Sequence, residues 1–318
     1  MKKEIPVFFT ADNGYAPYLA VAIHSLVKNA STDYHYKIIV LHEQISIENQ
    51  NKIKSLENDR TEIMFREMGE GLETITDRMS NRLRCDYFTL TIYFRLFIAT
   101  LFPEYDKGIY IDSDVVVPGD ISRMYETELG DNLIGACRDY SIQDIPEMCR
   151  YMDRGVGVGR EKYINSGVLL MNMKRLREVK IEKEFLRLLN KWHFDTIAPD
   201  QDYLNVMCNG RIIYLDECWD AMPKEGAQEL KEPMLIHYNL FAKPWCYDGI
   251  PYENYFWKYA EETPFLNEIK KYKAEYSEEQ KQSDTNCLET LIHHAGEIAE
   301  AEENFYTVYS QGRERRLR

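Results

Sequence analysis

Two carboxylates stand close together at the end of an apolar run. The run Ile109–Val117 contains Asp112 and Asp114, with Ser113 between them. Because side chains alternate between the two faces of a strand, both aspartates are expected on one side, where their like charges repel. A divalent cation between them would relieve this repulsion, and oxygen ligands with positions left for phosphate suit Mn²⁺ or Mg²⁺. The alternative is a strand that runs into an acidic loop.

Two known chemistries use an Asp-x-Asp motif of this kind. In haloacid-dehalogenase-like phosphatases, the motif ends the first strand of the domain and supplies an aspartyl nucleophile, which here would be Asp112. In nucleotide-sugar-dependent glycosyltransferases, the motif lies in the middle of the chain and bridges a metal ion to the donor diphosphate. About three predicted strands precede the motif in this chain, which counts against the phosphohydrolase and leaves it as the alternative.

The elements that would position these aspartates alternate between strands and helices. Short apolar runs predict buried strands, and apolar residues at helical spacing predict helices. Strands are predicted at Ile5–Thr10, Tyr36–Leu41, Glu62–Phe65, Lys107–Val117, Leu133–Cys137 and Gly167–Met173, and helices at Tyr18–Lys28, Ile47–Leu56, Thr89–Leu101, Ile181–Trp192 and Gln201–Asn209. This alternation predicts an α/β fold with a mostly parallel sheet and helices on both faces. Ligands in such sheets bind at the C-terminal strand ends.

The second half of the chain has less regular patterns. Ser141–Tyr163 has no clean period and is rich in glycine near its end, and we interpret it as a long mobile loop that forms a flexible lid. An amphipathic helix docked on the domain is predicted by aromatic residues at helical spacing, namely Tyr252, Tyr255, Phe256 and Tyr259. The polar stretch Ser277–Asp284 is expected to leave the core. A second amphipathic helix is expected to follow it, with Asn286 and Glu289 spaced as a capping box.

The composition excludes several classes of protein. The 318 residues carry a formal charge of −14 and are 44% apolar, as in a globular protein, and the acidic balance argues against a general nucleic-acid binder. The seven cysteines are scattered without a Cys-x-x-Cys pair, which is typical of a reduced intracellular protein and argues against structural zinc. No apolar run approaches the roughly 20 residues that span a bilayer. We therefore expect a cytoplasmic protein with no nucleic-acid partner.

From about Val7 to Trp245, the chain resembles glycosyltransferase family 8. This group of retaining enzymes includes bacterial lipopolysaccharide galactosyl- and glucosyltransferases and the glycogenins. The resemblance depends on ordered blocks at Phe9–Tyr15, Thr91–Leu96, Tyr110–Asp114, Gly135–Asp139, Asn165–Asn172 and Asp200–Asn205, and on His237-Tyr with Lys243-Pro-Trp245. It implies a GT-A type, Rossmann-like fold. It also implies a UDP-sugar donor, UDP-glucose or UDP-galactose, used with Mn²⁺ or Mg²⁺.

The resemblance also implies a role for each matching residue. The metal ligands would be Asp112, Asp114 and His237. The residues in contact with the nucleotide part of the donor would be Thr10, Asp12, Tyr15, Ser113 and Lys243, the last of these at the diphosphate. The residues that hold donor-sugar hydroxyls would be Arg95, Asp139, Asn165 and Asp200. Gln201 would lie near the anomeric carbon.

The reaction that follows from these roles has two candidate routes. Retaining glycosidases use a carboxylate nucleophile, whereas Gln201 is a poor nucleophile, so we favour front-face attack by the acceptor. Asp200 is the alternative nucleophile if a covalent intermediate forms. Two departures concern the contacts with ribose and phosphate: Gly14 stands where relatives often have Asn, and Leu240 where they have Gly. A catalytically weak nucleotide-sugar-binding protein is therefore a further alternative.

The chain is expected to divide near residue 250. Residues 1–250 would form the glycosyltransferase domain, and residues 251–318 a helical extension that contacts the acceptor or a membrane. The expected acceptor is a saccharide, a glycolipid or another cell-envelope component. The C-terminal cations Arg313, Arg315, Arg316 and Arg318 would each add about 1 kcal/mol to peripheral association with the inner membrane face. A solvated tail is the alternative that we favour.

Overall fold

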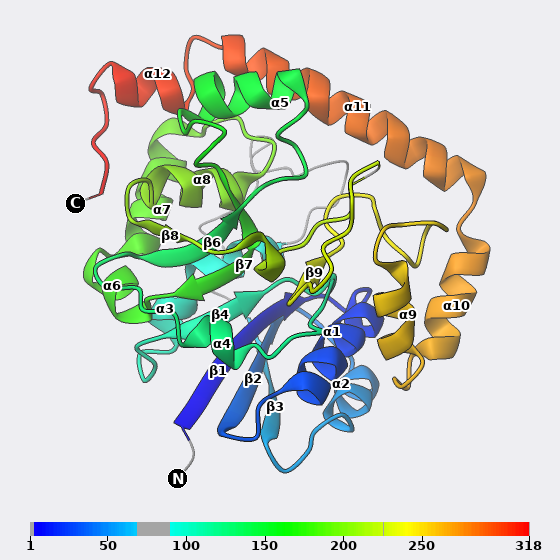
Figure 1. The fold of residues 1–318 in the computed structure, drawn as a ribbon. Helices are drawn as coiled ribbons and strands as arrows, with labels where there is room; N and C mark the ends of the chain where they lie inside the picture. Colours follow the sequence, from blue (N-terminus) through cyan, green and yellow to red (C-terminus); the bar gives the residue numbers. More distant parts are fainter. Residues whose placement is uncertain (1–2, 69–89, 225, 318) are drawn as a thin grey trace.

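The protein is built on one large central sheet, shown in Figure 1 in a computed structural model that describes residues 3–68, 90–224 and 226–317. Its seven strands lie in the order β3-β2-β1-β4-β7-β6-β8. They are β1 (Lys3–Ala11), β2 (Tyr34–His42), β3 (Thr61–Glu67), β4 (Gly108–Ile111), β6 (Ile134–Arg138), β7 (Ile164–Met171) and β8 (Ile212–Tyr214). Strand β7 runs antiparallel to both of its neighbours, and the other neighbouring strands are parallel. The predicted mostly parallel α/β sheet is confirmed.

Alternating side chains of the strands enter two separate cores. On β1, Val7 and Phe9 pack on one face of the sheet and Phe8 packs on the other. The first face is covered by α1 (Ala16–Asn29), α2 (Ile47–Lys54), α4 (Ser122–Tyr125), α9 (Glu253–Ala260) and α10 (Leu266–Glu275). The second is covered by α3 (Ile98–Leu101), α5 (Pro146–Arg150), α6 (Met173–Glu178), α7 (Ile181–Trp192), α8 (Pro199–Met207), α11 (Glu278–Glu300) and α12 (Phe305–Ser310). Burial on both faces explains the continuous apolar runs of the strands.

The strand predicted at Lys107–Val117 is interrupted at the two aspartates. Strand β4 ends at Ile111, and β5 (Val115–Val116) belongs to a separate two-stranded sheet with β9 (Ile236–His237). The backbone between them is held by other segments: the Asp112 amide donates to the Gly167 carbonyl at 2.8 Å, and the Asp114 carbonyl accepts from Tyr238 at 2.9 Å. The prediction of one straight strand is therefore wrong, because these long-range bonds turn the chain out of the sheet.

The helix predicted at Thr89–Leu101 consists of two shorter pieces. Residues Leu90–Leu96 form a 3₁₀ helix, η4, and α3 follows after Phe97, while Thr89 lies outside the described residues. Within η4, the Arg95 Nε donates to the Ile92 carbonyl at 3.0 Å. The buried guanidinium therefore engages its own backbone as well as distant carboxylates, an arrangement that helical periodicity alone does not reveal.

The mobile loop predicted at Ser141–Tyr163 is wrong. The segment contains α5 and a π-helix, η5 (Tyr151–Val156), and Tyr151 and Met152 are completely buried in the second core. A Cβ atom at Gly155 would lie 3.0 Å from the Tyr151 ring and 3.4 Å from Ile298 of α11. Gly155 thus lets this segment pack closely against α11, so the segment is not a flexible lid.

The aromatic helix after residue 250 docks as predicted, because Phe256 and Tyr259 of α9 are buried in the first core. The next prediction is wrong: α11 begins at Glu278, so the polar stretch from Ser277 is helical. Ser277 caps the helix and forms a capping box with Gln280, whereas Asn286 lies inside α11. Helical turns that face water have polar sequences. Such a sequence resembles that of a linker, which explains the wrong prediction.

The remaining sequence-level expectations concern cysteines, membranes and the C-terminus. Cys137, Cys149, Cys208, Cys218 and Cys246 are free thiols; Cys287, however, is disulfide-bonded, so the expectation of a fully reduced chain is not met. Among the described residues, no helix is both long and apolar enough to cross a membrane. In the C-terminal segment, Glu314 binds Arg187 of α7 and Arg313 binds Glu303, so this segment docks on the protein; Arg318 lies outside the described residues.

The position of the α11 cap can be tested by two substitutions. Ser277→Ala removes a side chain that accepts a hydrogen bond from the Gln280 amide at 3.2 Å, and we expect it to lower the free energy of unfolding by about 1 kcal/mol. Asn286→Ala, at an exposed position inside the helix, should be neutral or slightly stabilising because alanine favours helix. Urea unfolding followed by circular dichroism measures both. Equal losses in the two variants would contradict the assignment of the cap.

Candidate metal and donor site

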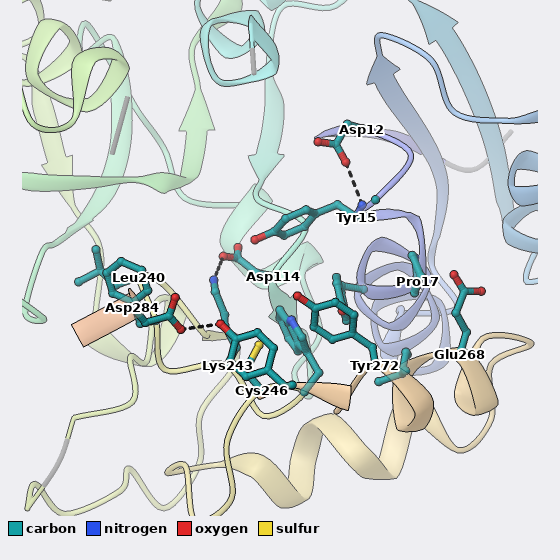
Figure 2. A pocket seen from close by; sticks show the side chains of 16 residues that line it. Asp12, Tyr15, Pro17, Asp114, Leu240, Lys243, Cys246, Glu268, Tyr272 and Asp284 are labelled. Carbon is teal, nitrogen blue, oxygen red and sulfur yellow. Dashed lines mark hydrogen bonds and ion pairs between the residues drawn. The ribbon is translucent and has the colours of Figure 1, made fainter. Parts of the chain in front are cut away.

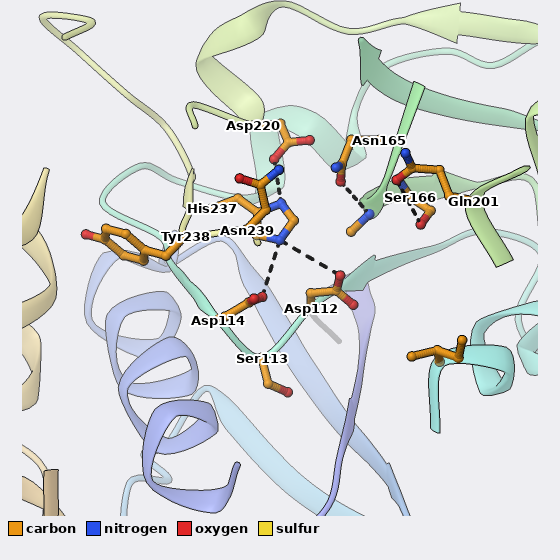
Figure 3. Close-up of polar contacts among 12 residues, drawn as sticks. Asp112, Ser113, Asp114, Asn165, Ser166, Gln201, Asp220, His237, Tyr238 and Asn239 are labelled. Atoms are coloured by element: carbon orange, nitrogen blue, oxygen red, sulfur yellow. Dashed lines mark hydrogen bonds and ion pairs between the residues drawn. The ribbon is translucent and has the colours of Figure 1, made fainter. Parts of the chain in front are cut away.

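Three candidate metal ligands converge where β4 ends. Ligand atoms of Asp112, Asp114 and His237 all lie within 4.8 Å of one another. In Figure 3, the His237 ring faces both aspartates. The His237 Nε2 is 3.3 Å from an Asp114 oxygen and 3.9 Å from an Asp112 oxygen. Pairing of β5 with β9 sets Val115 opposite His237, which brings the imidazole beside the Asp-x-Asp turn. Two carboxylates and one imidazole are a donor set that suits Mn²⁺ and also accommodates Mg²⁺.

A buried carboxylate that the sequence reasoning missed orients the imidazole. Asp220 is completely buried, and its Oδ1 lies 3.0 Å from His237 Nδ1. Burial lowers the pKa of His237, but Asp114 and Asp220 outweigh burial and raise it to about 10, while burial raises the pKa of Asp220 to about 6. Metal-binding histidines commonly bond a second carboxylate in this way, which leaves the other ring nitrogen facing the ion. Asp220 lies on a loop without a sequence motif. Only its position in the folded structure, beside His237, reveals its role.

Gly167 fixes the space around the ligands. A Cβ atom there would lie 2.3 Å from His237 Cε1 and 2.7 Å from an Asp112 oxygen, closer than side chains can approach. Only glycine therefore lets β7 run beside the cluster. The Asn165-Ser-Gly block had pointed to Asn165 and not to this glycine. The fit of the donor set and of the bare backbone supports a bound cation at this position.

Two buried cations balance the two aspartates. Arg95 is 5% exposed and places its Nη2 2.9 Å from Asp112, while its Nε is 3.1 Å from Asp200. The Lys243 ammonium forms an ion pair with Asp114. Burial would raise the pKa of Asp114, but Lys243 and His237 outweigh burial and lower it well below its usual range. Asp114 therefore remains ionised and available as a ligand.

The residues assigned to the donor sugar form one hydrogen-bonded group at the start of α8. Gln201 accepts a bond from the Ser166 amide at 3.0 Å and donates to Asp139 at 2.9 Å. Asn165 donates to the same carboxylate at 3.3 Å, and Asp200 accepts from the Ser166 hydroxyl at 2.9 Å. All five side chains are buried. The structure thus brings Asp139, Asn165, Asp200 and Gln201 together, and it adds Ser166, which the sequence reasoning did not assign.

The residues assigned to the nucleotide lie on the other side of the aspartates. Asp12 accepts a bond from the Tyr15 amide at 2.9 Å, which shapes the loop after β1. Ser113 donates to the Thr10 carbonyl at 2.7 Å and so ties the Asp-x-Asp turn to the end of β1. The Thr10 hydroxyl bonds to Tyr110 at 2.8 Å. Thr10 and Ser113 therefore hold the framework of the site, while Asp12 and Tyr15 line an open cavity.

Two cavities meet at Asp114 and Leu240. The larger, about 460 Å³, is lined by Asp12 and Tyr15 and by Lys243 (Figure 2). The smaller, about 150 Å³, is lined by Arg95, Asp112, Asn165, Asp200, Gln201 and His237. Both include Asp114 and Leu240 in their walls. A two-part ligand with charge at its middle can therefore lie across the carboxylates.

Leu240 and Gly14, the two departures from the family pattern, both line the larger cavity. The φ of Leu240 is +52°, in the left-handed region that costs a residue with a Cβ roughly 1–2 kcal/mol. The backbone at this position therefore keeps the conformation that glycine adopts without strain, and the leucine side chain is added to the junction of the cavities. Gly14 leaves its Cβ position 3.3 Å from an Asp12 oxygen, so an added side chain would press on that carboxylate.

The sheet topology and a carboxylate–histidine cluster at the end of β4 define a GT-A type glycosyltransferase fold. The model of Glycosyl transferase family 8 matches residues 6–249, and the chain belongs to this family. The structure of the galactosyltransferase LgtC, in complex with donor and acceptor sugar analogs, aligns with a TM-score of 0.69 and 25% identity over 82% of this chain and 96% of that one.

Relatives with this family's activities are also similar in sequence. The glycosyltransferase GlyE of Streptococcus pneumoniae is 27% identical over 75% of this chain and 56% of its own length. The lipopolysaccharide 1,2-glucosyltransferase of Escherichia coli is 27% identical over 56% of this chain and 60% of its own length. The chain thus spans less than two thirds of either relative. Family membership supports a transferase and argues against the phosphohydrolase alternative for Asp112.

The space that Gly167 leaves can be tested with Gly167→Ala. Because the new methyl group would collide with His237 and Asp112, we expect Mn²⁺ affinity to fall by at least about tenfold, the effect typical of a displaced ligand shell. Isothermal titration calorimetry measures it. Gly296→Ala is the control and should bind Mn²⁺ as wild type does. Among the described residues, apart from its chain neighbours and the backbone of its own helix, no heavy atom lies within 4 Å of its Cβ position. Unchanged affinity in Gly167→Ala would contradict the metal site.

Asp220 can be tested independently of activity. Asp220→Asn keeps an acceptor for His237 but removes the charge, and we expect Mn²⁺ affinity to fall by about 10- to 100-fold. Asp216→Asn is the matched control, because the Asp216 side chain caps a short helix through the Cys218 amide at 3.0 Å and is not among the three candidate ligands. Calorimetry with Mn²⁺ and thermal unfolding separate ligand orientation from stability. Equal Mn²⁺ affinity in the two variants would rule out a role in orienting the histidine.

Proposed function

We propose that this protein transfers a hexose, glucose or galactose, from a UDP-sugar to a saccharide or lipid-linked acceptor with retention of configuration and with Mn²⁺ or Mg²⁺. The observation that carries the proposal is the pair of cavities that meet at Asp114. A nucleotide sugar has a nucleoside and a hexose joined by a diphosphate. The larger cavity would take the nucleoside, the smaller cavity the hexose, and the junction the diphosphate.

The residues at the junction would bind the diphosphate. Asp112, Asp114 and His237 would hold the cation, which, when bound, offsets the negative charge that develops on the leaving diphosphate. Lys243 forms an ion pair with Asp114. Its ammonium group would turn partly from this carboxylate to a phosphate oxygen of the donor. Leu240, at the junction, would narrow the passage between nucleoside and hexose.

The hydrogen-bonded group at the start of α8 would bind the hexose. Asp139 and Asn165 present oxygen and nitrogen atoms that suit sugar hydroxyls, and Gln201 lines the same cavity. The Asp200 carboxylate is engaged by Arg95 and Ser166, which lowers its reactivity as a nucleophile. These contacts favour front-face attack by the acceptor over a covalent intermediate on Asp200.

The proposal also covers the role of residues 251–318 and the cellular location of the protein. Residues 1–250 would be the catalytic domain, and residues 251–318 an extension that contributes to substrate contacts. The acceptor would be a saccharide or glycolipid of the cell envelope, because contacts that select an acceptor lie on variable segments. A cytoplasmic location at the inner membrane face would bring the enzyme to such an acceptor. The second candidate function, a nucleotide-sugar-binding protein with little turnover, is favoured by the strained Leu240 at the junction.

Donor hydrolysis in the absence of acceptor tests the proposal. We expect wild type to hydrolyse UDP-glucose or UDP-galactose in the presence of Mn²⁺. Asp114→Asn should lose at least about 100-fold in rate, because it removes a charged ligand of the cation that would stabilise the leaving diphosphate. Released UDP measures the rate. Asp131→Asn, at an 88% exposed side chain, should hydrolyse as wild type does. Binding of UDP with Mn²⁺ but no hydrolysis of any hexose donor would instead support the binding protein.

A further inference from the structure

The larger cavity is completed by helices that lie beyond the family match at residue 249. Its lining includes Glu268, Ile269 and Tyr272 of α10, Tyr276 after that helix, and Asp284 of α11. Opposite them lie the loop after β1, the start of α1 and the segment that carries Lys243. In Figure 2, Tyr272 and Asp284 face the same space as Tyr15 and Lys243. The extension therefore forms a wall of this cavity.

Aromatic rings dominate this wall and its neighbours. The Tyr18 ring stacks on Trp245 with centroids 4.1 Å apart, and Tyr272 meets Tyr18 edge to face at 6.4 Å. Tyr276 lies beside Tyr272 at 5.7 Å. Tyr272 is 40% exposed although it contacts the rings of Tyr18 and Tyr276. A flat ligand that enters the cavity would therefore meet this residue.

A carboxylate at the cavity is fixed in place by two tyrosines. Asp284 Oδ2 accepts bonds from the hydroxyls of Tyr247 and Tyr276, both at 2.7 Å. Tyr247 belongs to the matched part of the chain and Tyr276 to the extension, so this carboxylate joins the two. A carboxylate held in this way offers its remaining acceptor capacity to hydroxyl or imide donors of a ligand.

We propose that α10 and the start of α11 form part of the donor site and bind the nucleoside half of the UDP-sugar, with Tyr272 stacking on it and Asp284 accepting a hydrogen bond from it. This inference rests on the proposed function. The direction of the ligand follows from the cavities: the wall of the larger one reaches Asp114 and Lys243 at the junction, and the hydrogen-bonded group for the hexose lies in the smaller one. A cavity of about 460 Å³ lies in the range usual for small-molecule sites.

The test compares two exposed tyrosines in the intact 318-residue chain. Tyr272→Ala should weaken UDP binding with Mn²⁺ by about tenfold, the usual effect of removing a ring that stacks on a base, whereas Tyr272→Phe should bind as wild type does. Tyr306→Ala is the matched control, because Tyr306 of α12 is 45% exposed and lines a different cavity. Quenching of tryptophan fluorescence reports binding, since Trp245 lines the cavity.

Inorganic pyrophosphate separates this inference from the proposed function. It occupies only the junction, so Tyr272→Ala should leave its affinity unchanged while weakening that of UDP. If Tyr272→Ala binds UDP as tightly as wild type, and Asp114→Asn does not, the extension has no part in the site although the proposed function stands. If pyrophosphate affinity falls as much as UDP affinity, the tyrosine acts on the junction and the inference is wrong. A wild-type protein that binds no UDP would overturn both.

Discussion

The repulsion between Asp112 and Asp114 is the constraint on which the rest of the site depends. Their ligand atoms lie within reach of a single ion, and burial in a protein makes the repulsion costly unless cations compensate for it. Arg95 from η4 pairs with one carboxylate and Lys243 from a late loop pairs with the other. Segments far apart in the chain are therefore drawn to one point by charge. A bound metal ion would interact with the two aspartates, and a bound diphosphate would interact with the metal ion and with Lys243.

The topology of the sheet delivers these groups to that point. Strand β4 lies between β1, which is parallel to it, and β7, which is antiparallel, so the end of β4 meets the end of β1 and the start of β7. This is where the Asp-x-Asp turn, the loop of Asp12 and the Asn165-Ser-Gly block come together. The small β5–β9 sheet then adds His237. A ligand at this edge would contact four separate segments. Ligand sites in α/β sheets usually lie where the strand order reverses, which here is between β1 and β4.

The helices after residue 250 have two physical roles. Helices α9 and α10 cover one face of the sheet, and α11 crosses to the other face and packs against the π-helix (Figure 1). Their inner residues stabilise the domain, while Tyr272 and Asp284 line the larger cavity. These two residues contribute side chains to the cavity and no strand to the sheet.

The sequence by itself determined the alternating α/β pattern, the apolar runs of the sheet and the Asp-x-Asp pair. These features depend on residues that are close together in the chain, because burial on both faces requires a continuous apolar run and the two charges are two residues apart. Only the tertiary structure decided where the strand breaks at Asp112, that Asp220 orients His237, and that Gly167 leaves room for both. The structure also shows that Ser141–Tyr163 contains packed helices where the sequence predicted a loop, and that the cap of α11 is Ser277. Each of these features depends on a partner far away in the chain. The periodicity of a sequence predicts whether a residue is buried, but it does not predict which distant group that residue contacts.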